Sequence, residues 1–279
     1  MTAVAVSARA LRRVPPTAWA AFVVVAVVAV WAVAAPWIVP DATAQDLVLG
    51  VTPAGTPGHL FGTDDLGRDI LALTVAGTRS AVLGPLVIAA GSTALGVVLG
   101  SLAGWAGGWL DALVGRWTDL VLALPGMLLA IVVAGLVDGG YWVTVALLVV
   151  LFSPADIRLV RAAVAAERGK PYIEAPRVLG VPAARIVVRH VLPNVRPVIL
   201  ANLFLNVAYG LVSMSSLSFL GLGVSPASAD WGRQLSDARN LLFTNPAAAI
   251  VPGLLIIAVS TAVNLLGDRL ADRAEGVAA

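Results

Sequence analysis

Long apolar runs recur along this sequence and restrict the folds open to it. The first, Thr17–Val39, carries no charged residue, and a run of this length can cross a hydrocarbon core of roughly 30 Å as a helix. Five further apolar runs follow, at 81–103, 119–137, 141–157, 197–220 and 247–266. The sequence therefore predicts an all-α membrane protein with six transmembrane helices.

The overall composition agrees with a membrane location. Only 12% of the residues are charged and 59% are hydrophobic, with a mean hydropathy of +0.93. A soluble globular domain carries about 25% charged residues, so this chain lacks the polar residues needed to cover itself in water. It contains no cysteine, which excludes disulfides and thiolate metal sites. The net charge of +2 gives no indication of a nucleic-acid partner, and the lipid bilayer is the expected surrounding.

The distribution of basic residues predicts the orientation of the spans. The apolar part of the fourth run, Tyr141–Phe152, is short for a membrane span. If it crosses, both termini lie on the same side as the basic segment 158–196, together with Arg9, Arg12 and Arg13. Of the 18 Lys and Arg residues, the opposite side then holds Arg68, Arg79, Arg233 and Arg239. Because basic residues collect on the cytoplasmic side, we predict a plasma-membrane protein with both termini in the cytoplasm.

A polar segment rich in Gly and Pro, residues 41–79, separates the first two spans. Its aspartates and the nearby His59 would allow a metal site. The alternative is helix capping, in which Thr63 caps a helix and Asp64 and Asp65 interact favourably with the dipole of its first turn. We favour capping, and no metal site is predicted.

The segment 161–194 is a charged island in this otherwise apolar chain. Its pattern predicts two short helices, Tyr172–Leu179 and Ala183–Leu192, joined at Gly180, which can adopt the backbone angles of a sharp turn. Pro193 is expected to end the second helix. Such a small helix pair buries little apolar area alone and requires a partner surface. On charge alone, a solvated basic loop between two spans is the alternative.

The order of residues in this segment resembles the EAA loop of ABC importer permeases. That family has a Glu-Ala-Ala sequence followed at fixed spacing by a glycine and then by Leu-Pro, and Glu174-Ala175, Gly180 and Leu192-Pro193 have this spacing. Pro176 departs from the pattern, which has a second alanine at this position. Further motifs resemble the C-type subunit of the dipeptide, oligopeptide and nickel permease branch; they lie at 59–69, 77–83, 189–194, 217–223 and 230–232.

This resemblance implies a type I ABC importer permease fold, with six transmembrane helices and a cytoplasmic EAA loop, residues 161–194, that holds a coupling helix. It implies as partners a homologous second permease subunit in a heterodimer, two cytoplasmic ATPase subunits and an extracytoplasmic substrate-binding protein. Residues 1–79 would hold the N-terminal tail, the first span and an extracytoplasmic segment, and residues 80–279 a five-span core. The loop would couple to an ATPase subunit through Glu174, Ala175, Arg177, Gly180, Arg189, His190 and Pro193.

Two spans carry patterns that predict contacts inside the membrane. The second span is rich in small residues, which let helices approach closely, so its glycines are expected to pack against a neighbour. The fifth span carries polar residues three and four positions apart, which places them on one helix face. This polar stripe consists of Asn202, Asn206, Tyr209, Ser213 and Ser216. It either bonds a neighbouring helix or lines a hydrated path, and its length favours the path.

The motifs that the sequence lacks separate the possible functions. It contains no Gly-x-x-x-x-Gly-Lys-Ser/Thr, no His-Glu-x-x-His and no Gly-x-Ser-x-Gly. We therefore predict no catalytic residue and no cofactor in this chain, so that ATP and Mg would be bound by partner subunits. The preferred function is a permease subunit of an ATP-driven importer for di- or oligopeptides.

Three alternatives stay open. A nickel or metal-chelate importer of the same branch shares the motifs. A secondary transporter working alone would couple an ion gradient through charges inside the membrane, whereas the predicted span interiors are nearly free of charge. A membrane enzyme is disfavoured by the absent motifs.

Overall fold

The computed structural model describes residues 16–137, 139–225 and 227–278, with side chains as far as residue 271. The predicted basic tail with Arg9, Arg12 and Arg13 lies outside these residues. Within them the chain is almost entirely helical, and isolated bridges are its only β structure. The α-helices are α1 (Pro16–Ile38), α2 (Ile70–Ala106), α3 (Gly108–Leu122), α4 (Gly126–Leu136), α5 (Gly140–Arg168), α6 (Pro171–Val178), α7 (Ala183–Ile186), α8 (Leu192–Phe219), α9 (Trp231–Asp237) and α10 (Ala247–Ala278). The shorter elements are a π-helical segment, η1 (Val187–Val191), and a 3-10 segment, η2 (Ala238–Leu241).

Five helical stretches are long and apolar enough to cross a membrane: α1, α2, α5, the joined helix 183–219, and α10 as far as residue 271. The third predicted span is instead a helix pair, α3 and α4, which meet at an angle of 81°. The pair begins at Gly108 rather than at the predicted Asp119. Pro125 is the N-cap of α4 and has no N–H with which to continue the preceding helix. With the bent pair counted as one crossing, six spans are present, and the all-α membrane fold is confirmed.

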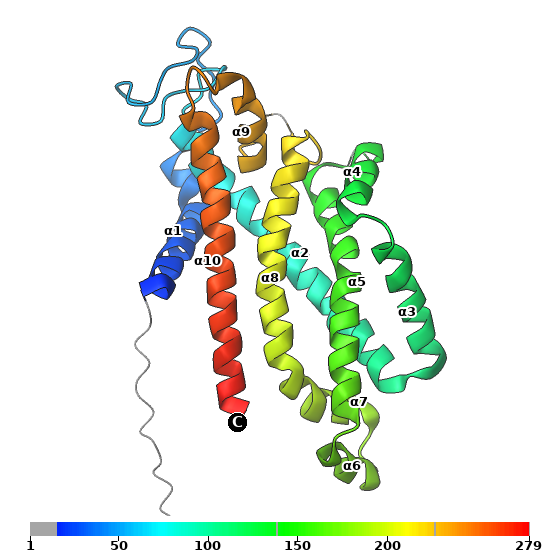
Figure 1. The fold of residues 1–279 in the computed structure, drawn as a ribbon. Coiled ribbons are helices and arrows are strands. Elements are labelled where there is room, and N and C mark those ends of the chain that lie inside the picture. The colour runs from blue at the N-terminus through cyan, green and yellow to red at the C-terminus, as the bar shows by residue number, and fades with distance from the viewer. Residues whose placement is uncertain (1–15, 138, 226, 279) are drawn as a thin grey trace, which may run out of the picture.

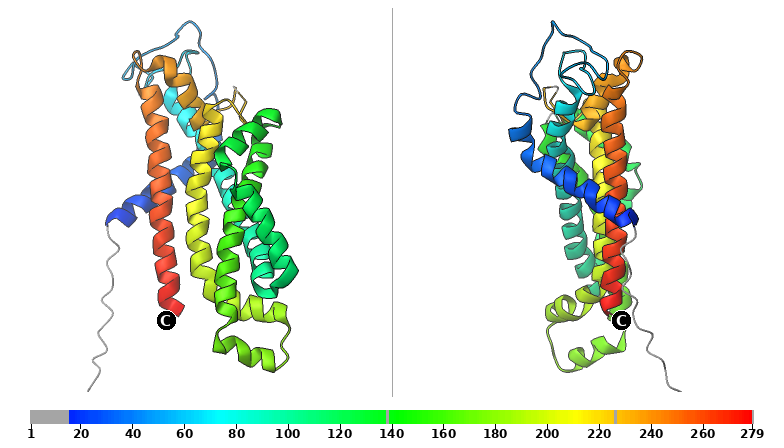
Figure 2. Two further views of the ribbon diagram at one scale, coloured as in Figure 1. Left: turned by 45° about the vertical axis from the view of Figure 1, so that its right-hand side comes forward. Right: turned by 90° about the vertical axis from the view of Figure 1, so that its left-hand side faces the viewer.

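The long helices run side by side along one axis, and the connecting segments gather at its two ends (Figure 1). One end holds residues 39–69 and α9, and the other holds α6, α7 and the end of α10. Helix α1 packs against α2 and α10 and crosses them obliquely (Figure 2). The basic segment 161–194 therefore lies at the opposite end from the polar segment 41–69, as the predicted order of spans requires.

Glycines let α2 and α5 approach each other closely. A Cβ at Gly96 would lie 2.6 Å from the Cβ of Asp156, and one at Gly100 would lie 2.8 Å from the carbonyl oxygen of Ile157. Neither position leaves room for a larger residue without moving the facing helix. The predicted packing role of the glycines in the second span is confirmed.

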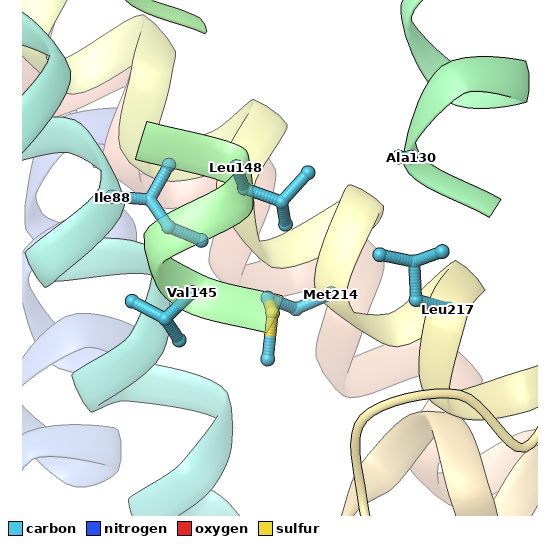
Figure 3. Close-up of a cluster of buried hydrophobic side chains, with 6 residues drawn as sticks. All are labelled: Ile88, Ala130, Val145, Leu148, Met214 and Leu217. Atoms are coloured by element: carbon cyan, nitrogen blue, oxygen red, sulfur yellow. The ribbon is translucent and has the colours of Figure 1, made fainter. Parts of the chain in front are cut away.

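A buried apolar cluster joins α2, α4, α5 and α8. Figure 3 shows its six side chains, which are Ile88, Ala130, Val145, Leu148, Met214 and Leu217. Because lipid is as apolar as these side chains, they hold the helices together by close packing rather than by exclusion of water. The cluster sets how α8 lies against α5, and so positions the polar residues that both helices carry.

The start of α2 differs from the prediction. Asp69, not Thr63, caps this helix, and its carboxylate accepts a hydrogen bond from the Ala72 amide at 2.8 Å. Thr63 is fully buried in the preceding loop, where its hydroxyl donates to the carbonyl of Gly50 at 2.7 Å and accepts from the amide of Thr52 at 2.8 Å. The capping role was predicted at the wrong residue because the chain closes a compact loop before the helix begins.

The other polar residues of this loop form pairs. Asp64 and Asp65 precede the first turn of α2, so they do not act on its dipole. Asp64 instead forms a buried ion pair with Arg68 at 2.6 Å, and His59 lies 2.7 Å from Asp69. Among the described residues, no group of three His, Asp or Glu side chains could hold a metal ion.

Candidate functional site

Residues 169–191 form a helical hairpin at one end of the bundle. Helix α6 begins at Pro171, one residue before the predicted start, because proline is well tolerated in the first helical turn. Pro176 lies inside α6 and leaves it unbroken. The chain then turns at Gly180, whose φ of +72° falls in the left-handed region that glycine adopts without strain. The two short helices and the glycine turn predicted from the sequence are therefore present.

Apolar contacts fasten the hairpin to the bundle. Ile173 and Ile186, which are 0% and 1% exposed, pack with Val160 and Val164 of α5 and with Val191. Burying a side chain of this size stabilises a fold by about 1.5–3 kcal/mol. The hairpin is thus anchored through both of its arms to the end of α5.

Polar contacts at the base add to this anchor. The hydroxyl of Tyr172 donates to the carboxylate of Glu167, and the amide of Asn194 donates to the Tyr172 oxygen at 2.9 Å. Burial and the hydrogen bond to Glu167 raise the pKa of Tyr172. The guanidinium carbon of Arg177 lies 5.2 Å from the centre of the Trp105 ring, a cation–π contact with the end of α2.

The tip of the hairpin is exposed and partly apolar. Val178 and Leu179 are 86% and 81% exposed, and Glu174 and Ala175 are exposed beside them. Large apolar side chains that face outward from a firmly anchored hairpin form a surface suited to a protein partner.

The second arm continues past Pro193, contrary to the prediction that it ends there. Helix α7 passes through η1 directly into α8, so the helix extends from Ala183 to Phe219. The amide of Leu192 donates to the carbonyl of Val187, five residues earlier. This wider turn accommodates the proline, whose ring would meet the carbonyl four residues before it in a regular α-helix.

The predicted coupling residues consequently fall into two groups. The first lies on α6 and the hairpin turn and consists of Glu174, Ala175, Arg177 and Gly180. The second lies on the joint between α7 and α8 and consists of Arg189, His190 and Pro193. Only the first group lies beside the exposed tip residues Val178 and Leu179.

A buried polar cluster joins three helices midway along the bundle. Asp156 of α5 is 1% exposed and accepts hydrogen bonds from the amides of Asn202 and Asn206 of α8, at 2.6 and 2.9 Å. The Asn206 amide also lies 3.3 Å from the Ser92 hydroxyl of α2. Among the described residues no cation lies within ion-pair distance of Asp156. An ionisable group inside a membrane is costly, which makes this cluster a candidate functional position.

Asp156 is not among the residues predicted from the sequence. It lies near the end of the fourth predicted span, 141–157, and α5 extends through Pro154 to Arg168. The signal that could have found it is a single acid flanked by apolar residues, with two asparagines one helical turn apart on the next span. The expectation of nearly charge-free span interiors has this exception.

Four residues of the polar stripe line a cavity of about 360 Å³ between α4, α5 and α8: Asn202, Asn206, Tyr209 and Ser213. The cavity is otherwise largely apolar, with Met127 and Ala130 of α4 and Leu148 of α5 in its walls. Ser216 does not line it, and its hydroxyl donates to the carbonyl of Val212 in its own helix at 2.8 Å. The stripe thus both bonds a neighbouring helix, through its asparagines, and faces a cavity.

A second cavity, of about 530 Å³, lies toward the hairpin end between α5, α8 and α10. Asn202 and Leu205 line both cavities and lie at their shared boundary. Since Asn202 is held by Asp156, the buried carboxylate positions a side chain at the junction between the two spaces.

The family of binding-protein-dependent transport system inner membrane components matches residues 96–276 of this chain. The match includes the hairpin, Asp156 and the whole polar stripe. The chain belongs to this family. With its several apolar helices it is a multi-pass membrane permease component.

Curated members of the family resemble this chain over most of their length. The dipeptide transport system permease protein DppC of Haemophilus influenzae is 33% identical over 252 residues, which cover 88% of this chain and 85% of that protein. The di/tripeptide transport system permease protein DppC of Pseudomonas aeruginosa is 35% identical over 244 residues, covering 85% and 80%. A chain of the inward-facing MetNI methionine ABC transporter has the same fold, with a TM-score of 0.61 and 18% identity over 74% of this chain and 97% of that one.

Proposed function

We propose that this chain is a permease subunit of an ATP-driven importer of di- or oligopeptides. The observation that carries the proposal is the extended similarity to two permeases named for dipeptide and di/tripeptide transport, at 33% and 35% identity. The fold agrees, because a chain of a methionine ABC transporter shares it.

The chain would form half of a translocation pathway with a homologous second permease subunit. The sequence lacks a phosphate-binding loop, which supports ATP binding and hydrolysis in two separate cytoplasmic subunits. The concentration of basic residues around the hairpin supports an orientation with that end and both termini in the cytoplasm. A substrate-binding protein would then meet the opposite end, where residues 39–69 and α9 lie.

The hairpin would couple the ATPase to the spans. Its exposed tip, with Val178 and Leu179, would dock on an ATPase subunit, while Ile173 and Ile186 hold it against α5. Because the second arm is continuous with α8, a displacement of the hairpin would be transmitted to both α5 and α8. Closure of the ATPases on ATP would open the pathway outward, and hydrolysis would reset it.

The pathway would pass the polar stripe. Asn202, Asn206, Tyr209 and Ser213 provide hydrogen-bonding groups on one wall of the 360 Å³ cavity, and the remaining wall is largely apolar. A surface of this kind suits a peptide, which combines a polar backbone with side chains of either character.

The experiment that tests the function is uptake in cells that lack the gene, with and without a plasmid copy. Restored uptake of a labelled dipeptide, together with co-purification of an ATPase, is the expected result. Restored uptake of nickel without that of any peptide would contradict the proposal. Peptide transport by the purified chain alone in liposomes would contradict the ATP-driven mechanism.

A further inference from the structure

Three arginines of α5 line a groove at the hairpin end of the bundle. Arg158, Arg161 and Arg168 border a cavity of about 410 Å³ between the ends of α2, α3 and α5. Small residues form its floor, among them Ala103, Gly104, Ala162 and Ala165. Of the residues that line it, one is acidic, Asp111, so the lining is positively charged overall.

The arginines differ in their partners. Arg158 forms an ion pair with Asp119 at 2.5 Å, and Arg161 forms one with Asp111. Among the described residues, no acidic side chain lies within ion-pair distance of Arg168, which is exposed. Its guanidinium is therefore available to an anion from outside the chain.

The N-terminus of α3 opens into the same groove. Its N-cap, Gly107, lines the groove, has a φ of +67° and provides no capping side chain, so the first amides of this 15-residue helix lack a side-chain acceptor. A Cβ at Gly107 would lie 3.5 Å from Nη1 of Arg168, which places the guanidinium against this turn. Asp111, in the first turn of α3, is already paired with Arg161, so the guanidinium of Arg168 supplies the unpaired positive charge of the groove.

We propose that this groove binds the phosphate of an anionic phospholipid. Trp109, next to the groove, is 77% exposed, and exposed tryptophans of membrane proteins lie at the level of the lipid headgroups. Basic pockets between transmembrane helices on the cytoplasmic side bind such headgroups. The site goes beyond the proposed import function and uses only the orientation given there. Free phosphate has the same charged group, but the small apolar floor favours a lipid.

The test is native mass spectrometry of the purified full chain in mild detergent, titrated with phosphatidylglycerol or with phosphatidylcholine. We expect the wild type to retain phosphatidylglycerol preferentially. Arg168→Ala is expected to weaken that retention about fivefold, the contribution of one basic residue near a membrane surface. Arg168→Lys keeps the charge and should restore most of it. Arg185→Ala, which removes an exposed arginine of α7 outside the groove, is the matched control and should bind as the wild type does.

Equal retention by Arg168→Ala and Arg185→Ala would overturn the assignment of the groove. Equal retention of the two lipids by the wild type would overturn its preference for an anionic headgroup. Inorganic phosphate is the third arm, and if it displaces phosphatidylglycerol from the wild type at millimolar concentration, the ligand is a soluble phosphate and the lipid proposal fails. Because Arg168 is exposed and unpaired among the described residues, its variants are expected to fold, and their melting temperatures check this.

Discussion

Asn206 donates its side-chain amide to both carboxylate oxygens of Asp156, at 2.9 Å each, and so joins α8 to α5 inside the bundle. The amide nitrogens of Asn202 and Asn206 both point toward this carboxylate. Both asparagines also line the cavity of about 360 Å³. Asp156 therefore positions two residues of the stripe, and its removal should change the wall of this cavity.

Asp156→Ala is predicted to lower both stability and uptake. The change leaves the amides of Asn202 and Asn206 without their acceptor, at a cost of about 1–3 kcal/mol. Asp156→Asn keeps the volume and one acceptor oxygen, so it should lose less. The measurement is the melting temperature of the purified chain beside dipeptide uptake. A melting temperature unchanged in Asp156→Ala would show that the cluster does not hold the helices together.

Alanine at Asn202 is predicted to reduce transport more than assembly. The side chain lies at the boundary of both cavities, whereas Asn206 alone still joins α8 to Asp156. Ser216→Ala is the matched control, because Ser216 belongs to the same stripe but does not line the cavity. Uptake and the yield of the purified complex are compared. If the yield falls as far as uptake in Asn202→Ala, the residue serves helix contact and not the pathway.

Gly180→Ala is predicted to abolish uptake while the protein stays in the membrane. A residue with a Cβ pays about 1–2 kcal/mol to adopt the left-handed conformation of this turn, which would tilt the exposed tip. Glu174→Ala should have the same effect on uptake through the docking surface. Gly169→Ala is the control, since Gly169 has a φ of −86° and open space around it. Normal uptake and normal ATPase association in both Gly180→Ala and Glu174→Ala would exclude a coupling role.

Gly96→Ala is predicted to destabilise the bundle. The added Cβ would fall 2.6 Å from the Cβ of Asp156, so α2 and α5 have to separate, at a cost of about 1–3 kcal/mol. Gly135→Ala in α4 meets nothing within 4 Å and should be neutral or slightly stabilising. Thermal denaturation in detergent distinguishes the two, and equal melting temperatures would show that α2 and α5 can adjust freely.

The free energy of unfolding is predicted to fall as pH rises, because of Asp230, the N-cap residue of α9. Burial raises the pKa of Asp230 above the usual value of about 3.9, although the amides of Gly232 and Arg233 donate to its carboxylate. Between the usual and the raised pKa the folded chain binds more protons than the unfolded chain, so the free energy of unfolding decreases as pH rises through that window. The contribution of Asp230 to the free energy of unfolding is therefore most favourable at a pH below the usual pKa.

Asp230→Asn isolates this effect. The variant keeps an oxygen for the N-cap of α9 but does not titrate. Melting temperatures of wild type and variant, measured from about pH 4 upward, should diverge, with the wild type losing stability relative to the variant as pH rises. Parallel curves would assign the pH dependence to other groups.

The short helices and the turn of the hairpin, residues 169–191, could largely be predicted from the sequence. The backbone freedom of Gly180 predicted the turn, whereas the burial of Ile173 and Ile186 against α5 became visible only in the structure. The effects of two prolines, Pro125 and Pro193, were harder to predict. Pro125 ends a helix and accompanies a bend of 81°, whereas Pro193 is absorbed by a π turn. Which outcome occurs depends on whether the preceding carbonyls find other donors, and that is not encoded by the proline alone.

Run lengths and the placement of charges indicated that this chain is an all-α membrane protein with up to six spans and a basic hairpin at one end, because these are properties of contiguous residues. The pairing of Asp156 with Asn202 and Asn206 was decided only by the packed bundle. These residues lie 46 and 50 positions apart, and their contact depends on the rotation of α5 against α8, which the close approach of α2 and the apolar cluster around Leu148 and Met214 impose.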